Sequence, residues 1–384
     1  MLNFNYYNPT RIVFGKGTIS ELKNLIPKTA KTMLVYGGGS IRRNGVYDQV
    51  TAALGDGAVT EFGGIEPNPR YETCMKAIAQ AKAEGVDFLL AVGGGSTIDA
   101  TKFIAAATKY AGPDPWDILS NWPAVEDALP LGVVLTLPGT GSEMNAGAVI
   151  SRNSTREKLY FVSEHTFPRF SILDPETTYS LPDRQFANGT VDAYVQVLEQ
   201  YLTYDVDAPL QDRCSEGILL TLIAEAPKVK ADPRNYEARA NIMWCATNGL
   251  NGWIACGQPQ DWASHMIGHE LTALYGVDHG QSLAIVMPGV MQHERARKRT
   301  KLLQYAARVW GLVDGDEESR IDRAIAKTEE FFRSLGVATR LGECRIPAEA
   351  APLVASRLAD RKMLLGEHQD IGRKEVEQIV ALRA

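Results

Sequence analysis

The chain has 384 residues, which is enough for about two domains with separate hydrophobic cores. Its net charge of −6 argues against a nucleic-acid-binding protein, because such proteins normally carry a basic face. No apolar stretch reaches the roughly 18 residues that a membrane-spanning helix needs. The first residues lack the features of a signal peptide, and the five cysteines show no CxxC spacing. We therefore expect a soluble, cytoplasmic protein with free thiols.

Short apolar segments alternate with helical segments up to about residue 180. Residues 32–36, 87–92 and 132–137 are apolar almost throughout, which is typical of buried parallel strands. Between them, residues 71–84 and 99–109 have the apolar spacing of helices. Repeated strand–helix alternation predicts an α/β domain with a parallel, doubly wound sheet.

The β signal stops near Pro182. The segments with helical spacing after it are residues 185–202, 210–226, 236–250, 262–274, 298–309 and 317–335. This pattern predicts an all-α domain. Pro175 and Pro182 mark the transition, so we place one domain at residues 1–180 and the other at residues 181–384. The locally basic residues 295–301 are interpreted as a solvated helix face.

Two glycine clusters directly follow predicted strands. Residues 37–40 (Gly-Gly-Gly-Ser) follow the first strand, and residues 93–96 (Gly-Gly-Gly-Ser) follow the second and open a helix. Without a Cβ atom the backbone can approach a phosphate closely, and the first amides of a helix attract anions. Neither cluster is a G-x-G-x-x-G or Walker A motif, and a tight turn would explain either one alone. Two clusters in one domain favour a dinucleotide site.

Histidines gather in the second half of the chain. His265 and His269 are four residues apart on a predicted helix, hence on one face, and His279 follows at the helix end or in the next loop. Asp192 and Gln196 are also four apart on a predicted helix. Such a set suits Zn²⁺ or Fe²⁺. The spacing is not HExxH, which disfavours a metalloprotease, and a structural role explains any single histidine equally well.

Together, these motifs resemble the iron-containing (group III) alcohol dehydrogenases over essentially the whole chain, and most of all their NADPH-dependent aldehyde reductase and butanol dehydrogenase branch. The motifs that carry the resemblance are Phe14-Gly15-Lys16-Gly17, residues 37–40, Pro67-Asn68-Pro69, residues 93–96 with Asp99, Thr140-Gly141-Ser142-Glu143, Leu173-Asp174-Pro175, Asp192, and His265-x-x-x-His269 with His279-Gly280. The resemblance implies a Rossmann-like N-terminal domain, an all-α C-terminal domain, and a cleft between them that holds nicotinamide and metal.

The resemblance also implies which residues bind the metal. Family members use an Asp, a His four residues later, and the first and third histidines of the cluster. The corresponding positions here are Asp192, Gln196, His265 and His279. Spacing alone would have paired His265 with His269, whereas the family places His269 near the reacting centre as a candidate proton relay. Gln196 departs from the family, because an amide oxygen is a weaker ligand than imidazole. We expect a weaker or re-tuned site.

Cofactor choice is predicted at Gly37. NAD-specific relatives place an Asp at this strand end, where it would repel a 2′-phosphate of charge about −1.5 to −2. Gly37 leaves room, Ser40 offers a hydroxyl, and Arg42 and Arg43 lie nearby, which favours NADP(H). Lys158 matches a cofactor-contacting lysine of this branch, although a surface lysine in a strand-edge loop is the alternative. The predicted cofactor-binding residues are Gly37, Gly38, Gly39, Ser40, Gly94, Gly95, Ser96, Asp99, Thr136, Thr140, Ser142, Asn145 and Lys158.

These assignments predict an NADP(H)- and metal-dependent alcohol dehydrogenase or aldehyde reductase that acts on short- to medium-chain aldehydes and primary alcohols. A divalent metal would polarise the substrate oxygen, and NADP(H) would supply the hydride. Two alternatives stay open: a lyase like the dehydroquinate synthases, which share this fold and use NAD, and a nucleotide-binding protein without dehydrogenase activity that lost its metal through Gln196. We also expect a homodimer, with residues 11–14 as a plausible pairing strand.

Overall fold

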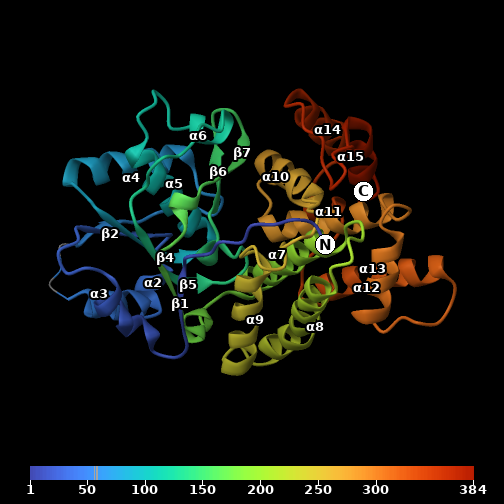
Figure 1. Cartoon of the computed structure of the whole chain (residues 1–384), viewed down its shortest axis with the longest axis horizontal. Coiled ribbons are helices and arrows are strands. Elements are labelled where there is room, and N and C mark those ends of the chain that lie inside the picture. Colours follow the sequence, from blue (N-terminus) through green and yellow to red (C-terminus); the bar gives the residue numbers. More distant parts are fainter. Residues whose placement is uncertain (56, 58) are drawn as a thin grey trace. The chain divides into compact units, whose positions relative to one another are not determined.

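The computed structural model describes residues 1–55, 57 and 59–384, which form two compact units (Figure 1). One unit is Tyr7–Leu181, and the other combines Met1–Tyr6 with Pro182–Ala384. The first contains a parallel sheet with helices, and the second is helical, so the predicted fold class is confirmed.

The Tyr7–Leu181 unit is built on a parallel sheet of six strands in the order β1-β8-β5-β4-β2-β3. These strands are β1 (Arg11–Phe14), β2 (Thr32–Tyr36), β3 (Val59–Phe62), β4 (Phe88–Gly94), β5 (Leu131–Leu137) and β8 (Phe170–Leu173). The apolar runs that predicted β2, β4 and β5 end within two residues of the observed strands. All three are central strands, which explains why they are apolar on both faces.

Helices pack against this sheet. The α-helices of the unit are α1 (Leu22–Leu25), α2 (Ser40–Arg43), α3 (Val46–Leu54), α4 (Tyr71–Glu84), α5 (Gly95–Lys109) and α6 (Asp117–Ser120). Short 3₁₀ turns are η1 (Thr18–Glu21), η2 (Ser142–Met144), η3 (Glu164–Thr166) and η4 (Pro175–Thr178). α5 packs on β4, on β5 and on an antiparallel hairpin of β6 (Gly147–Arg152) and β7 (Glu157–Val162). This hairpin was not predicted.

The regular elements of the second unit are all helical within its described residues, apart from one isolated bridge between Leu365 and Ile371. Its helices are α7 (Asp183–Tyr201), α8 (Pro209–Ala231), α9 (Tyr236–Gly249), α10 (Ala263–Tyr275), α11 (His279–His293), α12 (Arg299–Arg308), α13 (Glu317–Ser334), the 3₁₀ turn η5 (Gly342–Cys344), α14 (Ala350–Asp360) and α15 (Arg373–Ala381). α7 is the central helix, packed against α8, α9 and α11. Within the described parts of the chain, no helix combines the length and hydrophobicity needed to cross a membrane.

The interpretation of residues 295–301 as a solvated helix face is wrong for Lys298 and Lys301. Both side chains are 2% exposed. The ammonium group of Lys298 lies 2.7 Å from carboxylate oxygens of Asp261 and Glu367, and that of Lys301 lies 2.7 Å from Asp212. Because these acids come from distant parts of the sequence, the local pattern could not reveal that the two lysines are buried.

Candidate cofactor and metal sites

Both glycine clusters lie at the carboxyl ends of neighbouring strands. β2 and β4 are paired with Tyr36 opposite Val92, so the chain leaves the sheet at adjacent points. After β2 the chain continues to β3 on one side and then returns to form β4 on the other. In open α/β sheets, ligands bind outside the carboxyl ends of the strands at such a reversal of strand order. The topology therefore places both clusters where a dinucleotide would bind.

The glycines of the two clusters are there for different reasons. A Cβ atom at Gly93 or Gly95 would lie 2.4 Å from the side chains of Thr97 and Thr140, respectively, so packing alone requires glycine at both positions. At Gly38, a Cβ atom would have no neighbour within 4 Å. The fold therefore leaves open space beside Gly38, as a phosphate that approaches the backbone requires.

A buried polar network joins Asp99, Ser142 and Asn145. The Asp99 carboxylate accepts hydrogen bonds from the Ser142 hydroxyl (2.6 Å) and the Val149 amide (2.9 Å). Lys102 donates to the Ser142 hydroxyl and to the Asn145 side chain, both at 2.9 Å. Burial lowers the pKa of Lys102 to about 7, although the Asp99 carboxylate acts against this shift. Lys102, three residues after Asp99 on the same helix, is not among the predicted cofactor residues.

Three further predicted cofactor residues lie on β5, in the loop that follows it and on β7. Thr136 is buried on β5, and the Thr140 hydroxyl accepts a hydrogen bond from the Ser142 amide at 3.2 Å. Lys158 is on β7 and is 6% exposed, so it is not a surface lysine. Its ammonium group donates to the Asn68 side chain at 2.9 Å.

Arg42, close to the first cluster, is held by aromatic and acidic side chains. Its guanidinium lies 4.0 Å from the ring centre of Tyr47 and donates to the Tyr36 hydroxyl at 2.9 Å. It also forms a short ion pair with Glu61. The hydrogen bond with Tyr36 raises the pKa of Arg42, with a smaller contribution from Glu61. The Arg42 guanidinium, paired with the Glu61 carboxylate, therefore lies two residues beyond the end of the first glycine cluster.

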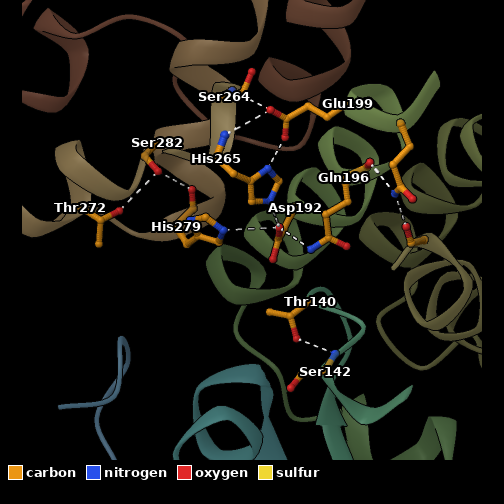
Figure 2. Close-up of polar contacts among 12 residues, drawn as sticks. Thr140, Ser142, Asp192, Gln196, Glu199, Ser264, His265, Thr272, His279 and Ser282 are labelled. Atoms are coloured by element: carbon orange, nitrogen blue, oxygen red, sulfur yellow. Dashed lines mark hydrogen bonds and ion pairs between the residues drawn. The ribbon is translucent and has the colours of Figure 1, made fainter. Parts of the chain in front are cut away.

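In the helical unit, Asp192, His265 and His279 converge from three helices (Figure 2). Asp192 is on α7, His265 on α10, and His279 is the first residue of α11. Their ligand atoms all lie within 4.8 Å of one another. Oδ1 of Asp192 is 3.6 Å from Nε2 of His265 and 3.8 Å from Nε2 of His279.

Gly280 explains how His279 reaches this place. A Cβ atom at Gly280 would lie 2.2 Å from the backbone oxygen of Asn188, so only glycine lets α11 begin this close to α7. The side chain of Asn188 also donates to Asp278 at 2.7 Å, which holds the start of α11. His279, expected at a helix end or in a loop, begins a helix that the sequence pattern did not predict.

The chemistry of this group fits a divalent metal. Nε2 of His265 is buried and makes no hydrogen bond within 3.5 Å in the described part of the chain. Burial alone would lower the pKa of His265, but the carboxylates of Glu199 and Asp192 outweigh it and raise the pKa to about 9. The site therefore attracts positive charge, and one carboxylate with two imidazoles is a donor set that suits Zn²⁺ or Fe²⁺.

Gln196 reaches the same site and is 2% exposed. Its amide nitrogen donates to Oδ1 of Asp192 at 2.8 Å, as Figure 2 shows, while its Oε1 is buried with no hydrogen-bond partner among the described residues. In this orientation the nitrogen, which is only a donor, faces the ligand carboxylate. A half-turn of the amide would bring the oxygen to the same place.

His269 lies beside the group. It is 4% exposed, and its ring centre is 5.1 Å from that of His279 and 6.3 Å from that of His265. Among the described residues, the set of converging ligand atoms contains His265 and His279 and does not include His269. Spacing along the helix alone would have paired His265 with His269.

Glu199 is a further residue of this site that the sequence pattern did not predict. This residue is 1% exposed, and its carboxylate accepts hydrogen bonds from the backbone amides of Ser264 (2.6 Å) and His265 (3.3 Å). The same carboxylate forms a short contact with Nδ1 of His265 (Figure 2). A signal was present, because Asp192, Gln196 and Glu199 are spaced four and three residues apart on one face of α7.

Comparison with known proteins agrees with this arrangement. Residues 9–175 match the family model of iron-containing alcohol dehydrogenases, and residues 186–383 match the C-terminal model of the same family. The chain is 54% identical to the NADPH-dependent aldehyde reductase YqhD of Escherichia coli, over 97% of each chain. It is 43% identical to a probable NADH-dependent butanol dehydrogenase 2 of Bacillus subtilis, over 100% of this chain and 99% of the relative.

A solved structure gives the same result. The crystal structure of E. coli K-12 YqhD superimposes with a TM-score of 0.99 at 52% identity, and covers 100% of this chain and 99% of that one. The sequence motifs, the converging Asp and His ligands and these comparisons agree. The chain belongs to the iron-containing alcohol dehydrogenase family, in the branch of YqhD and the butanol dehydrogenases.

Proposed function

We propose that this protein is an NADP(H)- and metal-dependent alcohol dehydrogenase or aldehyde reductase that acts on short- to medium-chain aldehydes and primary alcohols. The observation that carries the proposal is the convergence of ligand atoms from buried Asp192 and His265 and half-buried His279 within 4.8 Å. The relative at 54% identity, named an NADPH-dependent aldehyde reductase, supports the reaction class.

The metal would be held by Asp192, His265 and His279, with Gln196 as a weak fourth ligand after rotation of its amide. When bound, the metal supplies Lewis-acid polarisation of the substrate oxygen, and NADP(H) supplies the hydride. His269 is 4% exposed and lies outside the ligand group, with its ring centre 5.1 Å from that of His279. We assign to it the transfer of a proton to or from the substrate oxygen.

The nicotinamide cofactor would bind at the carboxyl ends of β2 and β4, with its phosphates over the two glycine clusters. Family membership does not decide between NADPH and NADH. The YqhD relative is named as NADPH-dependent, whereas the Bacillus subtilis relative carries NADH-dependent in its name. Gly37 supports NADP(H), because no carboxylate is present there to repel a 2′-phosphate. Ser40 offers a hydroxyl to the 2′-phosphate, and Arg42 would bind the phosphate by exchanging its ion pair with Glu61. Lys158 would complete the site at the hairpin.

We also propose that the enzyme is a cytoplasmic homodimer. All five cysteines are free thiols, which is typical of a reducing compartment. β1 is an edge strand of the sheet, and a strand edge offers backbone groups for pairing with a second chain. Light scattering of the purified protein would measure its mass in solution.

An experiment on the wild-type protein separates the proposal from its alternatives. The protein is purified without chelator or metal-affinity resin, its metal content is measured, and oxidation of NADPH is followed with butanal. The proposal expects bound divalent metal and aldehyde-dependent NADPH oxidation that is lost on metal removal. A nucleotide-binding protein without metal would bind NADPH and leave butanal unchanged, and a lyase would show no net NADPH oxidation.

A further inference from the structure

We propose that Glu199 is a positioning residue of the metal centre that fixes the imidazole of His265 with Nδ1 protonated and Nε2 turned toward the metal. Glu199 lies on α7 and is 1% exposed. The inference rests on the proposed metal centre, and it concerns a side chain that contacts the proposed ligand His265 and would not bind the metal itself.

Glu199 first acts as the cap of the helix that carries His265. The residue before α10, Trp262, has a left-handed backbone (φ 60°) and makes no side-chain cap. Oε1 of Glu199 provides the acceptor instead, since the amides of Ser264 and His265 donate to it at 2.6 and 3.3 Å. The partial positive charge of a helix N-terminus favours this carboxylate. The first turn of α10 is therefore tied to α7, the helix that carries Asp192.

The second oxygen of the same carboxylate sets the state of the imidazole. Oε2 of Glu199 pairs with Nδ1 of His265 (Figure 2). An ionised carboxylate only accepts hydrogen bonds, so Nδ1 must carry the proton. Nε2 is then the ring nitrogen left for the metal, and it lies 3.6 Å from Oδ1 of Asp192. Histidines that bind metals commonly donate their other ring N–H to a carboxylate, which fixes the tautomer and raises the basicity of the ligand.

A second carboxylate, Asp261, supports the same helix end without contacting the ring. Its Oδ1 accepts a hydrogen bond from the Ala263 amide at 2.9 Å, and its Oδ2 pairs with Lys298 at 2.7 Å. Its backbone amide donates to the Glu199 backbone oxygen at 3.1 Å. Both acids cap α10, and only Glu199 also contacts the imidazole of His265. Comparing the two therefore separates capping of the helix from orientation of the ring.

Glu199→Gln tests the proposal with little change in shape. If the new NH₂ group faces Nδ1 of His265, it places the ring proton on Nε2, where the metal must bind. If it faces α10 instead, it opposes two backbone N–H donors. Either orientation weakens the site. We expect the apparent Zn²⁺ dissociation constant of the full-length protein, measured by chelator competition, to rise about 10–100-fold.

Asp261→Asn is the matched control. It should lower the unfolding temperature of the metal-free protein but change the Zn²⁺ dissociation constant by less than about threefold. The proposal is overturned if Glu199→Gln binds Zn²⁺ as tightly as wild type, or if Asp261→Asn loses as much affinity. If Glu199→Gln does not fold, Glu199→Asp is tested instead. Its carboxylate is one methylene shorter and does not reach Nδ1, so this variant must bind Zn²⁺ more weakly than wild type. A wild-type protein that does not bind Zn²⁺ at all overturns the metal centre itself, and the role of Glu199 with it.

Discussion

Gln196→His should strengthen the metal site. In the structure the Gln196 amide donates to Oδ1 of Asp192 at 2.8 Å, and this is the oxygen on which the two histidines converge. A hydrogen bond to a charged group contributes about 1.5–3 kcal/mol, and the metal must compete with it for that oxygen. Imidazole removes this competitor and adds a nitrogen ligand on the same face of α7. Gly249 borders the Gln196 side chain and, having no side chain of its own, leaves room for the ring.

We expect Zn²⁺ affinity to rise at least about tenfold, which corresponds to about 1.4 kcal/mol. This gain is smaller than the full free energy that removal of the competing hydrogen bond could release. The assay is a chelator-competition titration with Zn²⁺ for wild type, Gln196→His and the control Gln196→Ala, paired with butanal reduction at limiting metal. The alanine variant removes the competing donor without supplying a nitrogen. If the histidine variant binds Zn²⁺ no more tightly than the alanine variant, the reasoning that position 196 points into the metal site is refuted.

Three further changes test other parts of the molecule. Gly37→Asp should move the cofactor preference toward NADH by at least about tenfold in the ratio of kcat/KM values. The Cβ of the new side chain would lie 3.3 Å from the Ile65 backbone oxygen, so NADH binding by the variant must be checked as a control. An unchanged preference for NADPH contradicts the assignment. His265→Ala should lose both metal and activity, whereas His269→Ala should keep its metal and lose about 10²–10⁴-fold in kcat. Metal content is measured by elemental analysis, and loss of metal from His269→Ala would show that the ligand assignment is wrong. Lys298→Met should lower the free energy of unfolding in denaturant by about 3–5 kcal/mol, because it leaves the carboxylates of Asp261 and Glu367 buried without their cation. A decrease below about 1 kcal/mol would mean that water replaces the lysine ammonium group as the partner of these carboxylates.

The sequence predicted the elements whose pattern is local. Residues 32–36 are apolar almost throughout because β2 is a central strand, and the strand has those limits in the structure. Residues 71–84 likewise form α4. α11 was missed because Pro288 and Gly289 interrupt its apolar run. Glu199 was missed for another reason: its role depends on a contact with α10, more than sixty residues away in the sequence.

Resemblance to a family supplied what spacing could not. Two histidines four residues apart on a helix are the usual first choice for a metal pair, and here that choice would have been His265 with His269. The structure instead brings His279 from the start of α11 to the ligand group. The orientation of the Gln196 amide depends on its hydrogen bond to Asp192, so no sequence pattern could have predicted it.

The position of β1 in the sheet affects how the chain can fold during synthesis. Residues 11–14 pair in parallel with residues 170–173 of β8, the last strand of the sheet to be made. At the usual translation rate of about 5–20 residues per second, β1 has left the ribosome roughly 8–30 s before its partner exists. During that time an extended segment with unpaired backbone groups stays exposed to other nascent chains. Conditions that slow translation should therefore increase aggregation of this protein, and substitutions that weaken β8 should act in the same direction.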